Sequence, residues 1–393
     1  MLRSSMTSIG FKKQGILVLV FLFFSICPFL FPLPFMKTNL QPYATAFGLI
    51  IIVINASRAI NVINASGFFK VLLLTSMVSC FVFMLSDINI QAVRGLFNHI
   101  SVLVIPLAVY VILSKKHGIS EKTVKILILF WFVVASIQLF VYRGFFANFI
   151  GTPKWSFELR GVIGLASEPS FLGIASFYML FLAQKFKKHK VLYISLITIM
   201  GTIYAQSFMG MVFVAVYFFL YWLDNANSKK GFLIIAMLIF GLILGWYLLS
   251  IYGTSTRLYI LIDSISSVGL EATVSGDESA TSRYNSLSDA YTDAFSNYLI
   301  PQGYQQRVGS GYGGFIIETG VFGLIECILV SIGMAMSYTR SITRYVSFGL
   351  ITFLLFMNTQ VGNPLLLLII GLNIWENKKL HVKNYGIYTV YPY

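Results

Sequence analysis

The chain has 393 residues, of which 57% are hydrophobic and only 11% are charged. This composition, which includes 36 phenylalanines, excludes an ordinary soluble domain and a disordered chain, and it is typical of a protein that crosses a membrane many times. The formal charge of +14 does not indicate nucleic-acid binding, because the lysines form small clusters just outside apolar runs and no basic face or arm. We interpret residues 1–393 as a single transmembrane bundle.

The apolar runs can be compared with the roughly 20 helical residues that a bilayer requires. Single helices are predicted over 15–33, 42–54, 68–85, 100–113, 124–142, 169–183, 232–251 and 314–337. Two longer runs, 191–223 and 345–375, are interrupted by polar residues near 206 and 358–364, and each predicts a tight helix pair. The sequence therefore predicts an all-α polytopic integral membrane protein with about twelve transmembrane helices.

The distribution of basic residues orients this arrangement, in which both termini lie on one side of the membrane. All but eight of the 28 Lys and Arg residues fall on the side of the termini, and the cytoplasmic side of a membrane protein is the basic one. The eight on the opposite side are Lys37, Arg94, Arg143, Lys154, Arg160, Arg257, Arg283 and Arg307. We therefore expect cytoplasmic termini and two polar loops outside, a smaller one over 143–168 and a large one over 252–312, between helices 9 and 10.

The smaller loop ends in a helix-start signal, in which Ser167 and Glu168 precede a proline. The residues alone leave two interpretations of Glu168 open: a simple cap of the sixth helix, or a functional carboxylate. Arg160 favours a functional site, because Gly161 and Gly164 leave a flexible backbone between this cation and the helix end, which would suit an anionic ligand.

The large loop concentrates charge, since it holds six of the chain's 14 acidic residues. Ionisable groups beside a bilayer are costly and tend to be functional. Apolar and aromatic residues at helical spacing predict an amphipathic helix near 283–299, capped by Thr281 or Ser282. Arg283 would then occupy its first turn, at a local cost of about 0.3–1 kcal/mol that a bound diphosphate would offset.

A glycine-rich stretch, 301–314, leads from this loop into the tenth helix. It lacks the Lys-Ser/Thr ending of a nucleotide-binding P-loop, so we expect it to let the backbone approach a bulky ligand, with Tyr304 and Tyr312 as stacking faces for sugars. Glu318 and Glu326 follow inside the tenth helix, where a carboxylate should be partnered or protonated. We expect a site role for Glu318 and a packing role for Glu326.

The histidines and cysteines indicate no metal centre and no disulfide framework. His99, His117, His189 and His381 are scattered outside both long external loops, and the three cysteines fall inside predicted helices. A Ser-His-Asp or metal mechanism is therefore unsupported, and no cofactor is expected.

The order of these features resembles the O-antigen polymerase, or Wzy-type, family of bacterial inner-membrane glycan polymerases, which shares a superfamily with the O-antigen ligases. The resemblance covers most of the chain. It rests on about twelve helices and on motifs in a fixed order: Arg160, the turn Glu168-Pro169-Ser170, Gln206-Ser207 with Gly210, Ser282-Arg283, Pro301-Gln302-Gly303-Tyr304 and Glu318-Thr319-Gly320. One motif departs from the family, because the eleventh residue after Arg160 is Phe171 where an Arg-x10-Gly pattern requires glycine.

The resemblance implies polymerisation of oligosaccharide units carried on undecaprenyl diphosphate, by a metal-independent glycosyltransferase in the bacterial inner membrane. Arginines can stabilise a diphosphate leaving group without a metal. Arg160 and Arg283 are the expected catalytic cations, and Glu168 is expected to orient or deprotonate the acceptor hydroxyl. The expected substrate-binding residues are Ser170, Tyr304, Arg307, Tyr312 and Glu318. Expected partners are the lipid-linked oligosaccharides, membrane lipid, a chain-length regulator and a flippase of the same pathway.

Two alternatives stay open. An O-antigen ligase has the same architecture but is expected to use a histidine in its large loop, and no histidine occurs over 252–312. Twelve helices with both ends inside also describe a polysaccharide-related transporter. Such carriers often join two six-helix halves by a long cytoplasmic link, whereas the link here, 184–190, is short.

Overall fold

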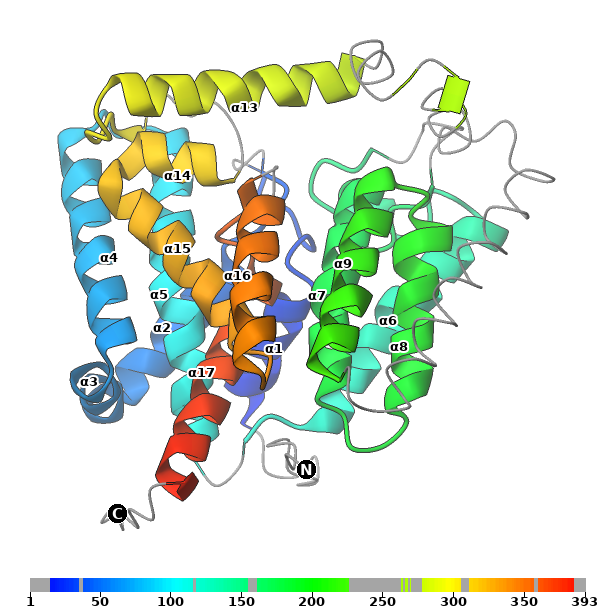
Figure 1. Cartoon of the computed structure of the whole chain (residues 1–393), viewed down its shortest axis with the longest axis horizontal. Helices are drawn as coiled ribbons and strands as arrows, with labels where there is room; N and C mark the ends of the chain where they lie inside the picture. Colours follow the sequence, from blue (N-terminus) through cyan, green and yellow to red (C-terminus); the bar gives the residue numbers. More distant parts are fainter. Residues whose placement is uncertain are drawn as a thin grey trace.

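The computed structural model describes residues 15–34, 38–115, 118–154, 161–225, 263, 266–267, 269, 278–304, 311–356 and 360–384. Within these residues the fold is helical, and one isolated antiparallel bridge joins Leu30 to Ile150. Figure 1 shows upright helices covered at one end by a single helix, α13, that lies across them. The all-α class predicted from the sequence is confirmed in the described part of the chain.

The N-terminal helices are α1 (Ile16–Ile26), α2 (Tyr43–Ile54), α3 (Ala56–Ala65), α4 (Gly67–Leu85), α5 (Ile90–Ser114) and α6 (Glu121–Phe140). Helices α2 and α3 meet at 96°. The predicted helix 100–113 is too short, because α5 starts ten residues earlier, where the Asn89 side chain accepts hydrogen bonds from the first-turn N–H groups of Gln91 and Ala92. This extension places Arg94 and His99 inside a helix.

Helices α7 (Pro169–Gln184), α8 (Lys190–Ile199) and α9 (Phe208–Asp224) form the next group. The run 191–223 is interrupted where it was predicted to be: α8 continues as a π-helical turn, Met200–Tyr204, and α9 begins after Ser207, whose side chain accepts a hydrogen bond from the Gly210 N–H. Gly173 and Gly210 let α7 and α9 approach closely, since a Cβ on Gly173 would lie 2.4 Å from the Gly210 Cα.

The C-terminal helices are α13 (Glu278–Ser296), α14 (Tyr312–Thr319), α15 (Val321–Ala335), α16 (Ser341–Phe356) and α17 (Pro364–Asn384). The prediction of one continuous helix over 314–337 is wrong. Gly320 has a φ of +63°, which ends α14, and the neighbouring segment 299–303 then satisfies the freed backbone groups. The N–H groups of Gln302 and Gly303 donate to the carbonyls of Ile317 and Glu318.

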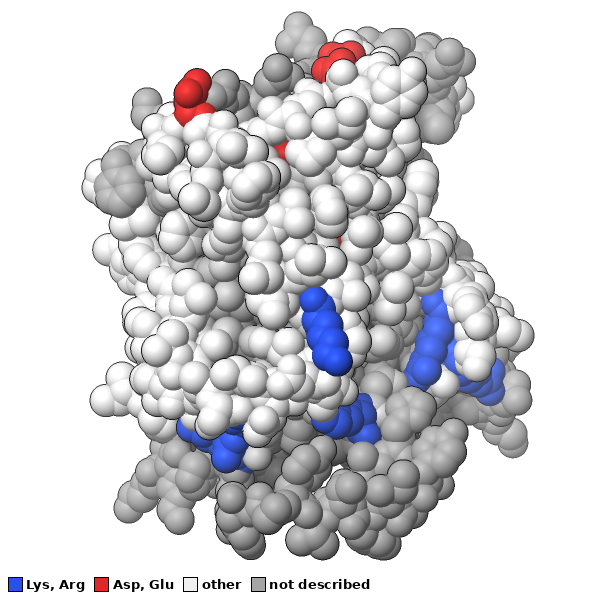
Figure 2. All heavy atoms as spheres, turned by 90° about the vertical axis from the view of Figure 1, so that its left-hand side faces the viewer, with Lys and Arg blue, Asp and Glu red and all other residues white. Residues whose placement is uncertain are grey.

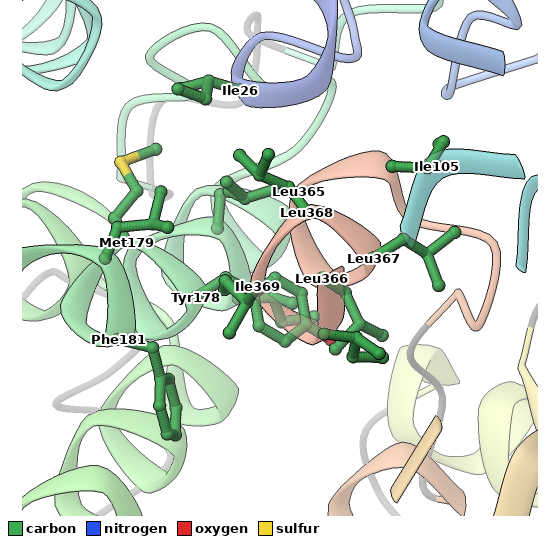
Figure 3. Packing of buried hydrophobic residues seen from close by; sticks show 14 of the residues in the cluster. Ile26, Ile105, Tyr178, Met179, Phe181, Leu365, Leu366, Leu367, Leu368 and Ile369 are labelled. Atoms are coloured by element: carbon green, nitrogen blue, oxygen red, sulfur yellow. The ribbon is translucent and has the colours of Figure 1, made fainter. Parts of the chain in front are cut away.

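The core of the bundle is built around the first half of α17. Residues 365–370 are all buried, which explains why this part of the sequence is apolar at every position. Figure 3 shows these side chains between α7, which carries Tyr178 and Met179, and Ile105 of α5, with Ile26 of α1 nearby. The sequence alone predicts that such a uniformly apolar segment is a buried helix, but it does not show which helices surround it.

The lengths of the helices support a membrane protein without establishing twelve spans. Among the described residues, α4, α5 and α6 are long and apolar enough to cross a membrane, and the bent pair α2–α3 would make a fourth span. Six further apolar helices have 10–17 residues. The predicted span 232–251 lies outside the described residues.

Charged side chains separate along the helix axes. On the face shown in Figure 2, the acidic side chains lie in the upper half, toward α13, and the basic side chains lie in the lower half. At the end opposite α13, ion pairs join Lys125 to Glu121 and Lys185 to Glu376, each at 2.6 Å. On the face shown in Figure 2, the two ends of the bundle therefore differ in charge, as the sequence predicts for a membrane protein.

Candidate functional site

Polar side chains lie on two neighbouring faces of the first three turns of α5. Gly95 and His99, four residues apart, face α14 and the segment before it. Arg94 and Asn98, also four apart, line a hollow beside α2 and α17. Residues i and i+4 share one helix face, so each pair defines one side of α5.

The first face carries a buried triad of His99, Glu318 and Glu326. His99 Nε2 lies 3.1 Å from Glu318 Oε2 in α14, and His99 Nδ1 lies 2.6 Å from Glu326 Oε2 in α15. All three side chains are completely buried. Removing a carboxylate from water is costly unless it is paired, and here one imidazole serves both carboxylates. The expectation that these carboxylates are partnered or protonated is confirmed. The expected substrate-binding role of Glu318 is wrong, because its side chain is completely buried.

Tyr304 packs against His99 of the triad. Its ring lies edge-on to the His99 ring, with centroids 5.8 Å apart, and its hydroxyl donates to the Ser79 carbonyl of α4 at 3.1 Å. Burial, reinforced by the nearby Glu318 carboxylate, raises the pKa of Tyr304 above its ordinary value, so the hydroxyl stays a neutral donor. A Cβ on Gly95 would lie 2.2 Å from Tyr304 Cδ1, so only glycine admits the ring here.

The second face lines a small hollow that is partly open to solvent. Its walls come from α5, from the start of α2 and from the start of α17. The lining residues include Gln41, Pro42, Thr45, Arg94, Asn98, Ser101, Gly362 and Pro364. The starts of two helices and one arginine thus border one space, and the arginine gives this space a positive charge.

Several residues predicted for the site cannot be placed. Arg160 and Arg307 lie outside the described residues. Arg283 lies within α13, but this helix begins at Glu278, so the prediction that Arg283 occupies the first turn and that Thr281 or Ser282 caps the helix is wrong. The preceding residues extend the helix by more than a turn. Arg283 therefore does not lie at the positive end of the helix, and the local cost expected for a cation in the first turn does not apply to it.

The start of α7 is where the sequence predicts it, with Glu168 at the N-cap position and proline next. The Glu168 side chain makes no capping hydrogen bond; its carboxylate pairs with Lys154 at 2.6 Å. Ser170 is half-buried in the first turn. The expected flexibility at Gly164 is wrong, because its N–H and carbonyl are both held by the Gln138 amide, at 2.7 and 2.8 Å.

Two further expectations need correction. Tyr304 and Tyr312 are both buried, so neither offers a ring face on which a sugar could stack. The Tyr312 hydroxyl donates to the Cys327 carbonyl at 2.9 Å and also touches the Ser331 hydroxyl, which makes it a packing residue of α14 and α15. Aromatic residues in a glycine-rich stretch suit either role, and burial decides between them.

His99 is the site residue that the sequence analysis missed. The predicted helix began at residue 100, and a lone histidine outside the external loops carried no signal. The available clue was the polar positions 91, 94 and 98, which continue the helical spacing toward the N-terminus and end at the capping residue Asn89. Its two partners lie 219 and 227 residues away, so no local pattern could reveal the triad.

Within the described residues no group of three His, Cys, Asp or Glu side chains has the arrangement of a metal site. No protein-family model, no curated protein and no solved structure matches the chain.

Proposed function

We propose that the protein is a membrane-embedded glycosyltransferase that polymerises oligosaccharide repeat units carried on undecaprenyl diphosphate. The observation that carries this proposal is the hollow beside α5, in which Arg94 and the starts of α2 and α17 border one space. A phosphate group matches such a site, because backbone N–H groups and a guanidinium both bind phosphate oxygens. A lipid diphosphate presents this headgroup at the membrane boundary.

The proposed reaction breaks the bond between the anomeric carbon of the growing glycan and the oxygen of its diphosphate, and forms a bond from that carbon to a hydroxyl oxygen of the next unit. The diphosphate leaves with the bonding electron pair and gains negative charge, which arginines can stabilise. The acceptor hydroxyl loses its proton to a base. Arg94, Arg160 and Arg283 are the proposed cations, Arg307 is proposed to help bind the substrate, and Glu168 is the proposed base.

The proposed orientation places α13 on the periplasmic side and both termini in the cytoplasm of a bacterial inner membrane. The separation of charge in Figure 2 supports it, since the basic end of a membrane protein faces the cytoplasm. In a cysteine-free background, an impermeant thiol reagent applied to intact cells should label Ser288→Cys and should leave Ser341→Cys unlabelled; both positions are exposed. Labelling of Ser341→Cys alone would reverse the orientation.

Deletion of the protein tests the function directly. Cells without a polymerase should make surface polysaccharide that carries a single repeat unit. Complete loss of the glycan would favour ligation or export, and an unchanged glycan would exclude the proposal.

With purified protein and lipid-linked repeat units, Glu168→Gln should lower the rate by about 10²–10⁴ if Glu168 is the base. Lys154→Ala removes the ion-pair partner of Glu168 and provides the matched control.

Arg160 and Arg283 provide a second test, because the proposal requires both to act on one diphosphate. Alanine at either position should cost on the order of 3 kcal/mol, or about a hundredfold in rate. Groups that act on one transition state are seldom additive, so the double variant should lose much less than the product of the single losses. A fully multiplicative loss would show that the two arginines act at separate places.

A further inference from the structure

The triad of His99, Glu318 and Glu326 has no part in the proposed reaction, because its three side chains are completely buried. Histidine and glutamate inside a membrane bundle are costly and are retained at functional sites, proton pathways among them. The triad also joins three separate helices, since His99 belongs to α5, Glu318 to α14 and Glu326 to α15. Any change in its bonding would act on the junction between these helices.

The geometry indicates how many protons the two hydrogen bonds of the triad need. Each ring nitrogen of His99 lies within hydrogen-bond distance of a carboxylate oxygen, at 3.1 and 2.6 Å, and each of these bonds needs a proton between nitrogen and oxygen. A neutral imidazole supplies one N–H, so the second proton must be additional, on the ring or on a carboxyl group. With both bonds formed, the triad carries one added proton and a net charge of −1.

Loss of the added proton would break one of the two bonds. A ring-nitrogen lone pair would then face a carboxylate lone pair, and the net buried charge would become −2. In an apolar bundle an extra uncompensated charge is strongly unfavourable. The other titratable groups near the triad are Tyr304, Cys80 of α4, Cys327 of α15 and, round the helix, Arg94 of α5. Tyr304 and the buried Cys327 thiol stay neutral, and Cys80 is exposed on the outer side of α4, so none of these groups replaces the proton.

We propose that His99, Glu318 and Glu326 form a proton-binding site whose occupancy controls how firmly α5 holds the broken helix α14–α15. The protonated triad ties both halves of the broken helix to one ring of α5. The segment before α14 is tied to the same place, because Gly303 donates to the Glu318 carbonyl and Tyr304 packs on His99. Proton release therefore loosens the junction and the segment that connects it to α13.

The variant Glu326→Gln keeps both hydrogen bonds of His99 but no longer needs the added proton. The glutamine amide can donate to Nδ1 of a neutral His99, while Nε2–H donates to Glu318, so both bonds persist without an added proton. The full-length wild type in detergent should lose thermal stability as pH rises, because the folded site binds a proton that the unfolded chain releases. Between the pKa of the site in the unfolded chain and its pKa in the folded protein, one bound proton changes the folding equilibrium by about tenfold per pH unit. Glu326→Gln should lack this dependence, and the control Glu121→Gln should keep it.

A second measurement follows the proton itself. The side-chain nitrogen NMR signals of His99, assigned by their absence in His99→Gln, should titrate in the wild type over the pH range in which stability falls, and should not titrate in Glu326→Gln. Equal pH profiles of stability for the wild type and Glu326→Gln would overturn the proposal. So would His99 signals that do not respond to pH. Neither measurement depends on polymerisation, so failure of the proton-site proposal can be distinguished from failure of the proposed function.

Discussion

The hollow and the triad lie on neighbouring faces of the same three turns of α5, yet they have opposite relations to solvent. Arg94 and Asn98 border an open space, whereas Gly95 and His99 face a sealed contact with Tyr304 and Glu318. A shift of one residue along a helix turns a side chain by about 100°, and here that turn separates the proposed ligand site from the proposed proton site. The two regions should therefore respond differently to substitution.

The largest expected effect is on activity, at the hollow. Arg94→Ala should lower the initial rate of polymerisation by about a hundredfold, or on the order of 3 kcal/mol, because it removes a cation from the proposed diphosphate site. Arg94→Lys should stay impaired, since lysine lacks the planar fork of arginine. Arg58→Ala, on the exposed side of α3, is the control. A near-normal rate for Arg94→Ala would remove the hollow from the active site.

The next effect is on stability, at the sealed face. Gly95→Ala should lower the free energy of unfolding by about 1–3 kcal/mol, because the new methyl group overlaps the buried Tyr304 ring. Gly67→Ala is the matched control, since a Cβ there meets no atom within 4 Å. Thermal unfolding in detergent measures both. An equal response of the two variants would show that the Tyr304 ring is not fixed against α5.

A smaller loss is expected from Tyr304→Phe, which keeps the ring and removes the hydroxyl that donates to the Ser79 carbonyl. The expected cost is about 1 kcal/mol of stability, the net value of one hydrogen bond. The pH dependence of stability should persist, because the triad keeps all its members. A variant that lost this dependence would assign the proton to Tyr304.

The smallest effect is expected from Ser101→Ala, on the wall of the hollow. The Ser101 hydroxyl donates to the Asn98 carbonyl at 2.6 Å within its own helix, so it is already committed there. Its loss should cost no more than about 0.5 kcal/mol of stability, the low end for one hydrogen bond, and should leave the rate of polymerisation near normal. A large fall in rate would indicate that the hydroxyl turns toward the ligand.

The sequence by itself determined the class of protein and the local start and stop signals. Apolar runs predict the helices, Pro169 marks the start of α7, and Ser207 and residues 358–364 mark interruptions that the structure contains. These signals are local, because capping, proline geometry and lipid-facing hydrophobicity act within a few residues of the chain.

Only the tertiary structure decided where the polar groups meet. The break at Gly320 depends on segment 299–303 supplying hydrogen bonds, and the partners of His99 lie more than two hundred residues away. Burial likewise decided that Tyr304 and Tyr312 are packing residues. In each case the deciding energy is the cost of leaving a buried polar group unpaired, and that cost depends on neighbours that the fold supplies.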